Sequence, residues 1–122
     1  MAYYDENKPT FMLDVLGTPY AVYMDISIED DEYLRDCEGY CDKTAKRIVI
    51  SGPDGDNQFA DWSVYEKTNL RHEIIHAFLF ESGLDGNSYW SNGQDDHNEQ
   101  MVQWLALQFP KLLKAFQLAR AL

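Results

Sequence analysis

The feature that most constrains this chain is an uninterrupted helical stretch that carries two histidines one turn apart. Residues 60–82 contain neither proline nor glycine, and Gly83 follows where a helix commonly ends in a left-handed residue. Within this stretch, residues 72–76 read His-Glu-Ile-Ile-His, an HExxH pattern. Residues four apart lie one above the other on a helix, about 6 Å apart along its axis. The pattern therefore predicts that His72 and His76 can reach one metal ion.

The chemistry of this pattern is that of a zinc site. Zinc with three protein ligands keeps one position for water and lowers the pKa of that water to about 7. Glu73, beside the first histidine, would take the water's proton as general base. The alternative is a pair of buried histidines bonded to backbone or carboxylate groups. The apolar residues around the pattern favour the metal-site interpretation. Polar side chains buried among them without a partner would cost several kcal/mol, by the usual penalty for buried groups.

A third ligand is expected downstream, where Glu99 and His97 compete for the position. They lie two residues apart, about 200° around a helix, so only one can face the metal. We favour Glu99, which heads an apolar stripe made of Val102, Ala106 and Phe109. Glu99 could instead close a capping box with Asp96. If Glu99 is the ligand, an oxyanion could be stabilised by His97, Tyr89 or Tyr65, and the sequence does not choose among these three.

The strand signals all lie in the first half of the chain. Residues 11–16 and 19–28 predict a hairpin around Gly17 and Thr18, and residues 39–41 and 47–51 predict two further strands. Residues 29–36 suit either a short helix or a solvated acidic loop. Together these segments predict a small, mainly antiparallel sheet of about four strands.

The second half is expected to be helical. After the first helix, Asp95 or Asp96 can cap a second helix that runs to Phe109, and Pro110 can open a third. Residues 110–122 are amphipathic and are expected to pack on the core. The chain of 122 residues is therefore expected to form a single α+β domain, residues 1–122, strand-rich over 10–51 and helical over 58–122.

Charge narrows the range of partners. The formal net charge is −11, and all 21 carboxylates lie at or before Glu99. Such a surface repels phosphate backbones and anionic lipid, so we expect a peptide or protein substrate and neither nucleic acid nor membrane. The polar N-terminus and the lack of a long apolar run predict a cytoplasmic protein. Cys37 and Cys41 lack zinc or redox spacing and are expected to be reduced thiols.

These motifs resemble the gluzincin branch of the zincin metallopeptidases, in which HExxH on one helix is completed by a glutamate on the next. The matching residues here are the 72–76 pattern and the Asn98-Glu99 dipeptide. Among small members the chain is similar to the ImmA and IrrE type. More closely, Gly-Tyr-Cys-Asp at 39–42 and residues 71–84 and 101–116 resemble small phage and prophage proteins. The resemblance implies a zincin-like fold with a small sheet packed on the metal helix and the ligand helix, and zinc held by a glutamate at 99 rather than a histidine at 97.

The expected function is therefore hydrolysis of peptide bonds by a zinc metallopeptidase. The substrate would lie extended along an edge of the sheet, for which we consider the strand at 47–51. One alternative is a catalytically silent phage or prophage accessory or binding protein in which zinc holds two helices together. Another is a metal-free core helix with paired histidines.

Overall fold

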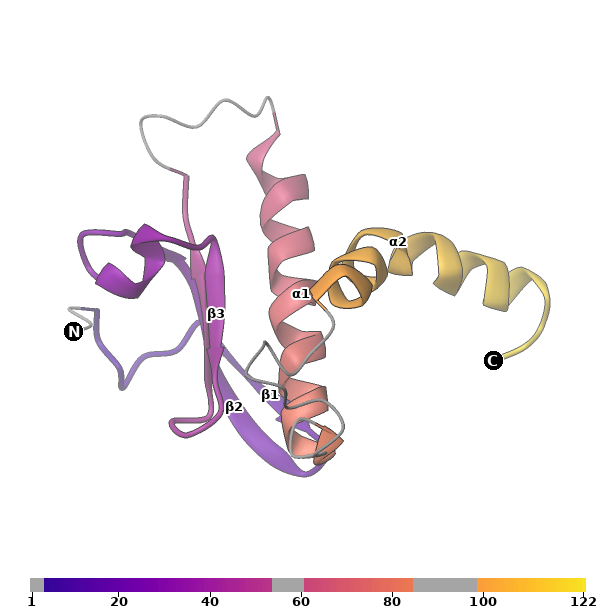
Figure 1. Cartoon of the computed structure of the whole chain (residues 1–122), viewed down its shortest axis with the longest axis horizontal. Helices are drawn as coiled ribbons and strands as arrows, with labels where there is room; N and C mark the ends of the chain where they lie inside the picture. Colours follow the sequence, from indigo (N-terminus) through magenta and orange to yellow (C-terminus); the bar gives the residue numbers. More distant parts are fainter. Residues whose placement is uncertain (1–3, 54–60, 85–98) are drawn as a thin grey trace.

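The computed structural model describes residues 4–53, 61–84 and 99–122. Figure 1 shows α1 lying against one face of a small sheet, with α2 starting beside α1 and pointing away from the sheet. The predicted α+β class is confirmed. In chain order the elements are β1 (Phe11–Val15), β2 (Thr18–Ile26), the 3-10 helix η1 (Glu32–Arg35), β3 (Gly39–Asp42), β4 (Arg47–Ser51), α1 (Trp62–Glu81) and α2 (Glu99–Leu118).

The predicted hairpin is present as β1 and β2, which pair antiparallel with Val15 opposite Thr18. Its turn consists of Leu16 and Gly17, which have φ angles of 52° and 92°. Two positive φ values in a two-residue loop give a mirror-image turn, whose twist matches that of the flanking strands. The Gly17 amide also donates a hydrogen bond of 3.3 Å to Oδ2 of Asp14.

The sheet is mixed, with the strand order β1-β2-β4-β3. β3 and β4 pair antiparallel, as β1 and β2 do, but the central pair β2 and β4 is parallel. After β2 the chain passes through η1 and enters β3, which lies two positions away from β2 in the sheet. β4 then takes the position between β2 and β3. Four strands were predicted correctly, but the expected mainly antiparallel sheet is a mixed one because of this crossover.

β4 lies inside the sheet, so the expectation that residues 47–51 form a sheet edge is wrong. Ile48, Val49 and Ile50 are all 0% exposed. Ile48 and Ile50 belong to the core under α1, whereas Val49 packs in a second cluster with Tyr23 and Leu34. A continuous apolar run is typical of a strand covered on both faces. β3 is the edge strand on this side of the described sheet.

The acidic segment 29–36 contains a short helix, one of its two predicted alternatives. Asp31 is fully buried and caps η1, accepting a hydrogen bond of 3.1 Å from the Tyr33 amide. The same carboxylate accepts a hydrogen bond from the Tyr40 hydroxyl on β3. Because buried carboxylates are stable only when their oxygens are paired, Asp31 fixes η1 against the start of the edge strand.

α2 continues through Pro110, so the prediction of a separate third helix is wrong. A proline inside a helix has no amide hydrogen and leaves the carbonyl four residues earlier without its helical donor. That carbonyl belongs to Ala106, which is fully buried against α1. Nε of Arg71 on α1 donates a hydrogen bond of 2.5 Å to it. A side chain of α1 thus replaces the hydrogen bond that Pro110 cannot make.

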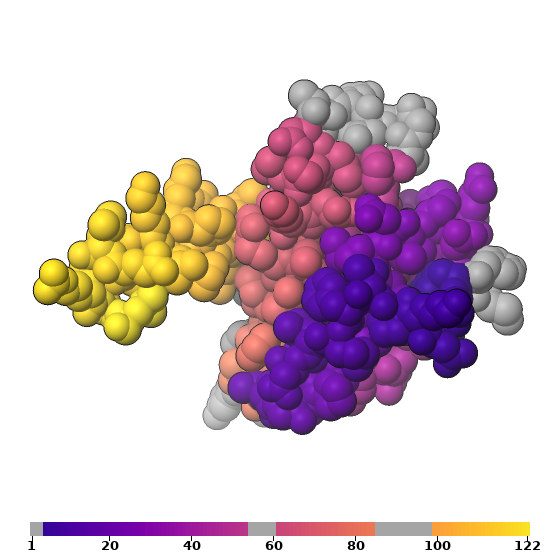
Figure 2. All heavy atoms as spheres, turned by 180° about the vertical axis from the view of Figure 1, so that it is seen from behind, coloured from indigo at the N-terminus to yellow at the C-terminus, as the bar shows by residue number. Residues whose placement is uncertain are grey.

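Beyond Pro110, α2 projects from the rest of the molecule (Figures 1 and 2). Phe116 and Leu118 are 44% and 77% exposed, so the expected packing of residues 110–122 on the core is not observed. Among the described residues, no helix has the length and apolar character needed to cross a membrane. The part of α2 that is fixed to the body is its first half, where Val102 and Ala106 are buried.

The Arg71 contact predicts a coupling with Pro110. Arg71→Met should lower the free energy of unfolding by about 1–3 kcal/mol, the usual penalty for a buried acceptor left unpaired. In a Pro110→Ala background the loss should shrink, because an alanine has the amide hydrogen that proline lacks. Urea denaturation of the four variants of this cycle measures the difference, with Lys67→Met as the control on an exposed position of α1. Equal losses in both backgrounds would contradict the coupling.

Candidate metal centre

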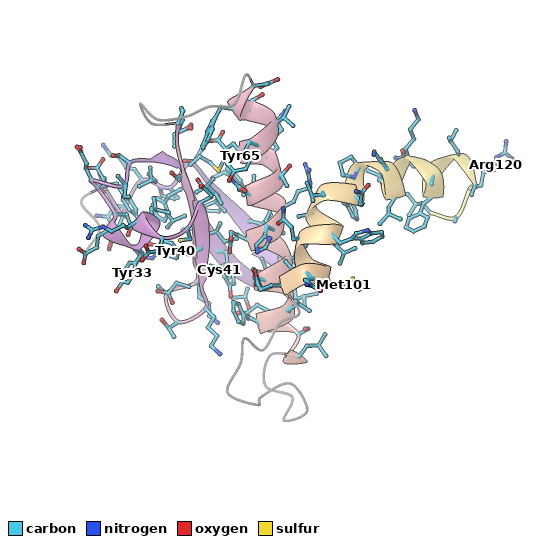
Figure 3. The ribbon with its side chains drawn as sticks, turned by 45° about the horizontal axis from the view of Figure 1, so that its top comes forward. Tyr33, Tyr40, Cys41, Tyr65, Met101 and Arg120 are labelled. Carbon is cyan, nitrogen blue, oxygen red and sulfur yellow. The ribbon has the colours of Figure 1, made fainter. Side chains whose placement is uncertain are left out.

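One face of α1 forms the floor of an open cleft of about 550 Å³. The neighbouring face, about a third of a turn around the helix, packs on the sheet through Leu70, Ile74 and Ala77. One wall of the cleft is the segment from Cys37 to Cys41, which includes β3, and the other is the start of α2. Figure 3 shows Cys41 on β3 and Tyr65 on α1, and Met101 at the start of α2 beside α1. The α1 residues that line the cleft repeat at helical spacing, and they are Tyr65, Asn69, His72, Glu73, His76 and Phe80.

Three ligand atoms converge in this cleft. Nε2 of His76 lies 2.6 Å from Oε1 of Glu99, and Nε2 of His72 lies 3.2 Å from Oε2 of the same carboxylate. The two Nε2 atoms are 3.2 Å apart. Ligands on a tetrahedral zinc with bonds of 2.0–2.1 Å are separated by about 3.3 Å, so the two imidazoles already have the spacing of a zinc site. Within the described residues, His72, His76 and Glu99 form a group that could hold a metal ion.

Gln103 on α2 fixes the tautomer of His72. Its amide oxygen Oε1 lies 2.7 Å from Nδ1 of His72, and an amide oxygen only accepts hydrogen bonds. Nδ1 therefore donates to Gln103, and when His72 is neutral the lone pair of Nε2 points into the cleft. That lone pair faces a carboxylate oxygen and a second imidazole nitrogen. A cation at the centre of these groups would be held by all three residues, and a ligand histidine oriented by an outer hydrogen bond is typical of metal sites.

Sequence reasoning missed Gln103, although a signal for it is present. Gln103 follows Glu99 by four residues, so both side chains lie on one face of α2. The Glu99 carboxylate contacts the Nε2 atoms, whereas the Gln103 amide contacts Nδ1 of His72. Once Glu99 is taken as a ligand, the residue one turn later on the same helix is the natural partner for a ligand histidine.

Glu73 is buried beside the cluster, with 8% of its surface exposed. Burial raises the pKa of its carboxyl to about 8, and the nearby Glu99 carboxylate adds to the effect. Gly39 on β3 makes room for it. A Cβ atom at Gly39 would lie 2.9 Å from Cδ1 of Ile50 and 3.5 Å from Cγ of Glu73. A glycine at position 39 therefore allows the edge strand to lie close to this carboxyl group.

The structure brings together His72, Glu73, His76 and Glu99, the four residues predicted to form the centre. His97, Tyr89 and the possible capping residue Asp96 lie outside the described residues. Tyr65, the remaining candidate for an oxyanion donor, lines the cleft. Burial and the Glu38 carboxylate raise the pKa of its phenol, so Tyr65 keeps its proton at neutral pH and can donate a hydrogen bond.

The two cysteines also border the cleft, and both are free thiols, as expected. Burial raises the pKa of Cys37, and it raises the pKa of Cys41 to about 12, helped by the carboxylate of Glu73. Thiols bind zinc as thiolates, so this environment disfavours both as ligands. The candidate donor set remains two imidazoles and one carboxylate.

Comparisons with models of protein families, with curated proteins and with solved structures found no match to this chain. Its function is therefore inferred from the residues of the cleft. The lining includes the carboxylates of Glu38 and Glu99 and the carboxyl group of Glu73, and none of the described lining residues is lysine or arginine. The cleft thus favours a cation electrostatically as well as by its donor geometry.

The contact between Gln103 and His72 predicts an effect on zinc affinity. Gln103→Ala should weaken zinc binding about 10- to 100-fold, as is usual when the partner of a ligand histidine is removed. Gln103→Glu should keep the affinity near the original value, because a carboxylate also accepts from Nδ1. Competition with a chromophoric chelator measures both variants, and Gln108→Ala on the same helix is the control. Unchanged affinity in Gln103→Ala would contradict the orienting role.

Proposed function

We propose that this chain is a zinc-dependent peptidase of the zincin superfamily, in its gluzincin branch, and that it hydrolyses peptide bonds. His72, His76 and Glu99 would hold the metal, and Glu73 would act as the general base. The observation that carries this proposal is the meeting of three ligand atoms at one point, with a buried carboxyl group beside them in an open cleft. A zincin-like fold, with the sheet against the HExxH helix, is part of the same proposal.

Each residue of the cleft would have its own role in hydrolysis. Bound zinc would polarise the scissile carbonyl and lower the pKa of the attacking water. Glu73 would accept the proton of that water and pass it to the leaving amine. A cation nearby favours the ionised form of a carboxyl group and opposes the effect of burial, so Glu73 would be a base once metal is present. Tyr65 is one candidate to donate a hydrogen bond to the oxyanion, with His97 and Tyr89 as the alternatives.

The substrate that suits this cleft is an extended peptide. β3 is the edge strand of the described sheet and also forms one wall of the cleft. An extended segment paired along a sheet edge is held by its main chain, which positions a scissile bond without requiring a particular sequence. Edge addition along β3, rather than along the buried β4, would place the peptide next to Glu73 and the proposed metal.

A second candidate function is supported by the attachment of α2. The buried residues of this helix are Val102 and Ala106, so its packing on α1 is small. Zinc bound to His72, His76 and Glu99 would join α1 to α2 and stabilise a binding protein without hydrolysis. Such a protein, for example a phage or prophage accessory protein, would keep the ligands but would not use Glu73 as a base.

Replacement of Glu73 by glutamine separates the two candidates. In a peptidase, Glu73→Gln should reduce hydrolysis at least about 100-fold, the usual contribution of a general base, and should retain one equivalent of zinc. The neutral amide should be tolerated, because the site already disfavours the charged carboxylate. Cleavage of a quenched fluorescent peptide library, together with elemental analysis, measures both properties.

Glu29→Gln changes an exposed carboxylate that does not line the cleft, so this variant is the matched control and should hydrolyse peptides as the original chain does. Unchanged hydrolysis in Glu73→Gln would contradict the proposed base. A zinc-loaded original chain that cleaves none of the library would favour the binding protein instead.

A further inference from the structure

Trp104 and Leu107 are two large apolar side chains on the outer face of α2. Val102 and Ala106 mark the face that packs on α1. Trp104 lies about 200° around the helix from Val102, and Leu107 about 140°. Each is 50% exposed. Half of the surface of each side chain is therefore open to a ligand on this face of α2.

The two side chains border a shallow hollow of about 590 Å³ next to the candidate metal centre. His72, Glu99 and Gln103 line both this hollow and the cleft, so the two spaces adjoin. The exposed surface of the hollow is mainly apolar, and among the described residues that line it Glu99 is the carboxylate. That carboxylate is already in contact with both imidazoles. The apolar surface left for a ligand is the indole of Trp104 and the side chain of Leu107, next to the amide of Gln100.

We infer that Trp104 and Leu107 bind an apolar side chain of the peptide substrate, beside the bond that is cut. The inference rests on the proposed peptidase function and adds a preference to it. A peptide held between β3 and α2 passes the metal centre, and a side chain that points toward α2 reaches the hollow across Glu99 and Gln103. Tryptophan offers a large rigid surface with little conformational entropy to lose, which is why it dominates many binding surfaces.

The test uses the full chain loaded with zinc and a series of peptidyl hydroxamates that differ in one side chain. Hydroxamates bind zinc, so calorimetry can measure the affinity for each side chain without requiring hydrolysis. Leucine or phenylalanine at the variable position should bind about 10- to 100-fold more tightly than serine, from the usual gain on burial of such a side chain. In Trp104→Ser the leucine compound should bind only a few-fold more tightly than the serine compound. Leu107→Gln should also reduce this difference in affinity.

Two controls separate this inference from the proposed function. Leu118→Ser removes an exposed apolar residue from the far end of α2 and should leave the ratio unchanged. Acetohydroxamate, which has no side chain, should bind the original chain and Trp104→Ser equally. Equal affinities for the leucine and serine compounds would overturn the inference while the metal centre stands. The same holds if the ratio of these affinities is unchanged in both Trp104→Ser and Leu107→Gln. Failure of acetohydroxamate to bind would remove the metal centre, and the inference with it.

Discussion

Three Lewis bases, two from α1 and one from α2, lie close together where the two helices meet. Two imidazole nitrogens and a carboxylate lie 2.6–3.2 Å from one another, and Gln103 leaves the lone pair of His72 directed at the other two. Without a cation, such groups repel unless protons are taken up between them. A divalent ion bound at this point would remove that repulsion and join the two helices. The same ion would favour the ionised form of the buried Glu73, which is the form that a general base requires.

The fold serves this junction by fixing α1 from both sides. The sheet covers one face of the helix through the fully buried Ile48 and Ile50, which leaves the stripe with the two histidines open to the cleft. On the other side, Arg71 donates to the carbonyl that Pro110 leaves free, so α2 stays continuous and remains close to α1. Glu99 and Gln103 thereby reach His72 from a helix that has few other buried contacts.

The sequence predicted those features that depend on local spacing. The four strands, the hairpin and the HExxH helix follow from periodicity and turn chemistry, and the grouping of Glu99 with His72 and His76 follows from helix geometry and family resemblance. The features that it missed depend on contacts distant in the chain. The parallel pairing of β2 with β4 arises from a crossover, and the continuity of α2 requires an arginine from another helix. The interior position of β4 in the sheet could have been predicted, because the apolar run Ile48-Val49-Ile50 is typical of a strand buried on both faces.

Elemental analysis of the purified chain measures whether His72, His76 and Glu99 bind one metal ion. The purified chain, after dialysis against buffer containing micromolar zinc and then against metal-free buffer, should retain one equivalent. His76→Ala removes one of three ligands and should retain none, while His97→Ala should retain the full equivalent because Glu99 occupies the third position. A chain without zinc, or zinc that persists in His76→Ala, would contradict the account.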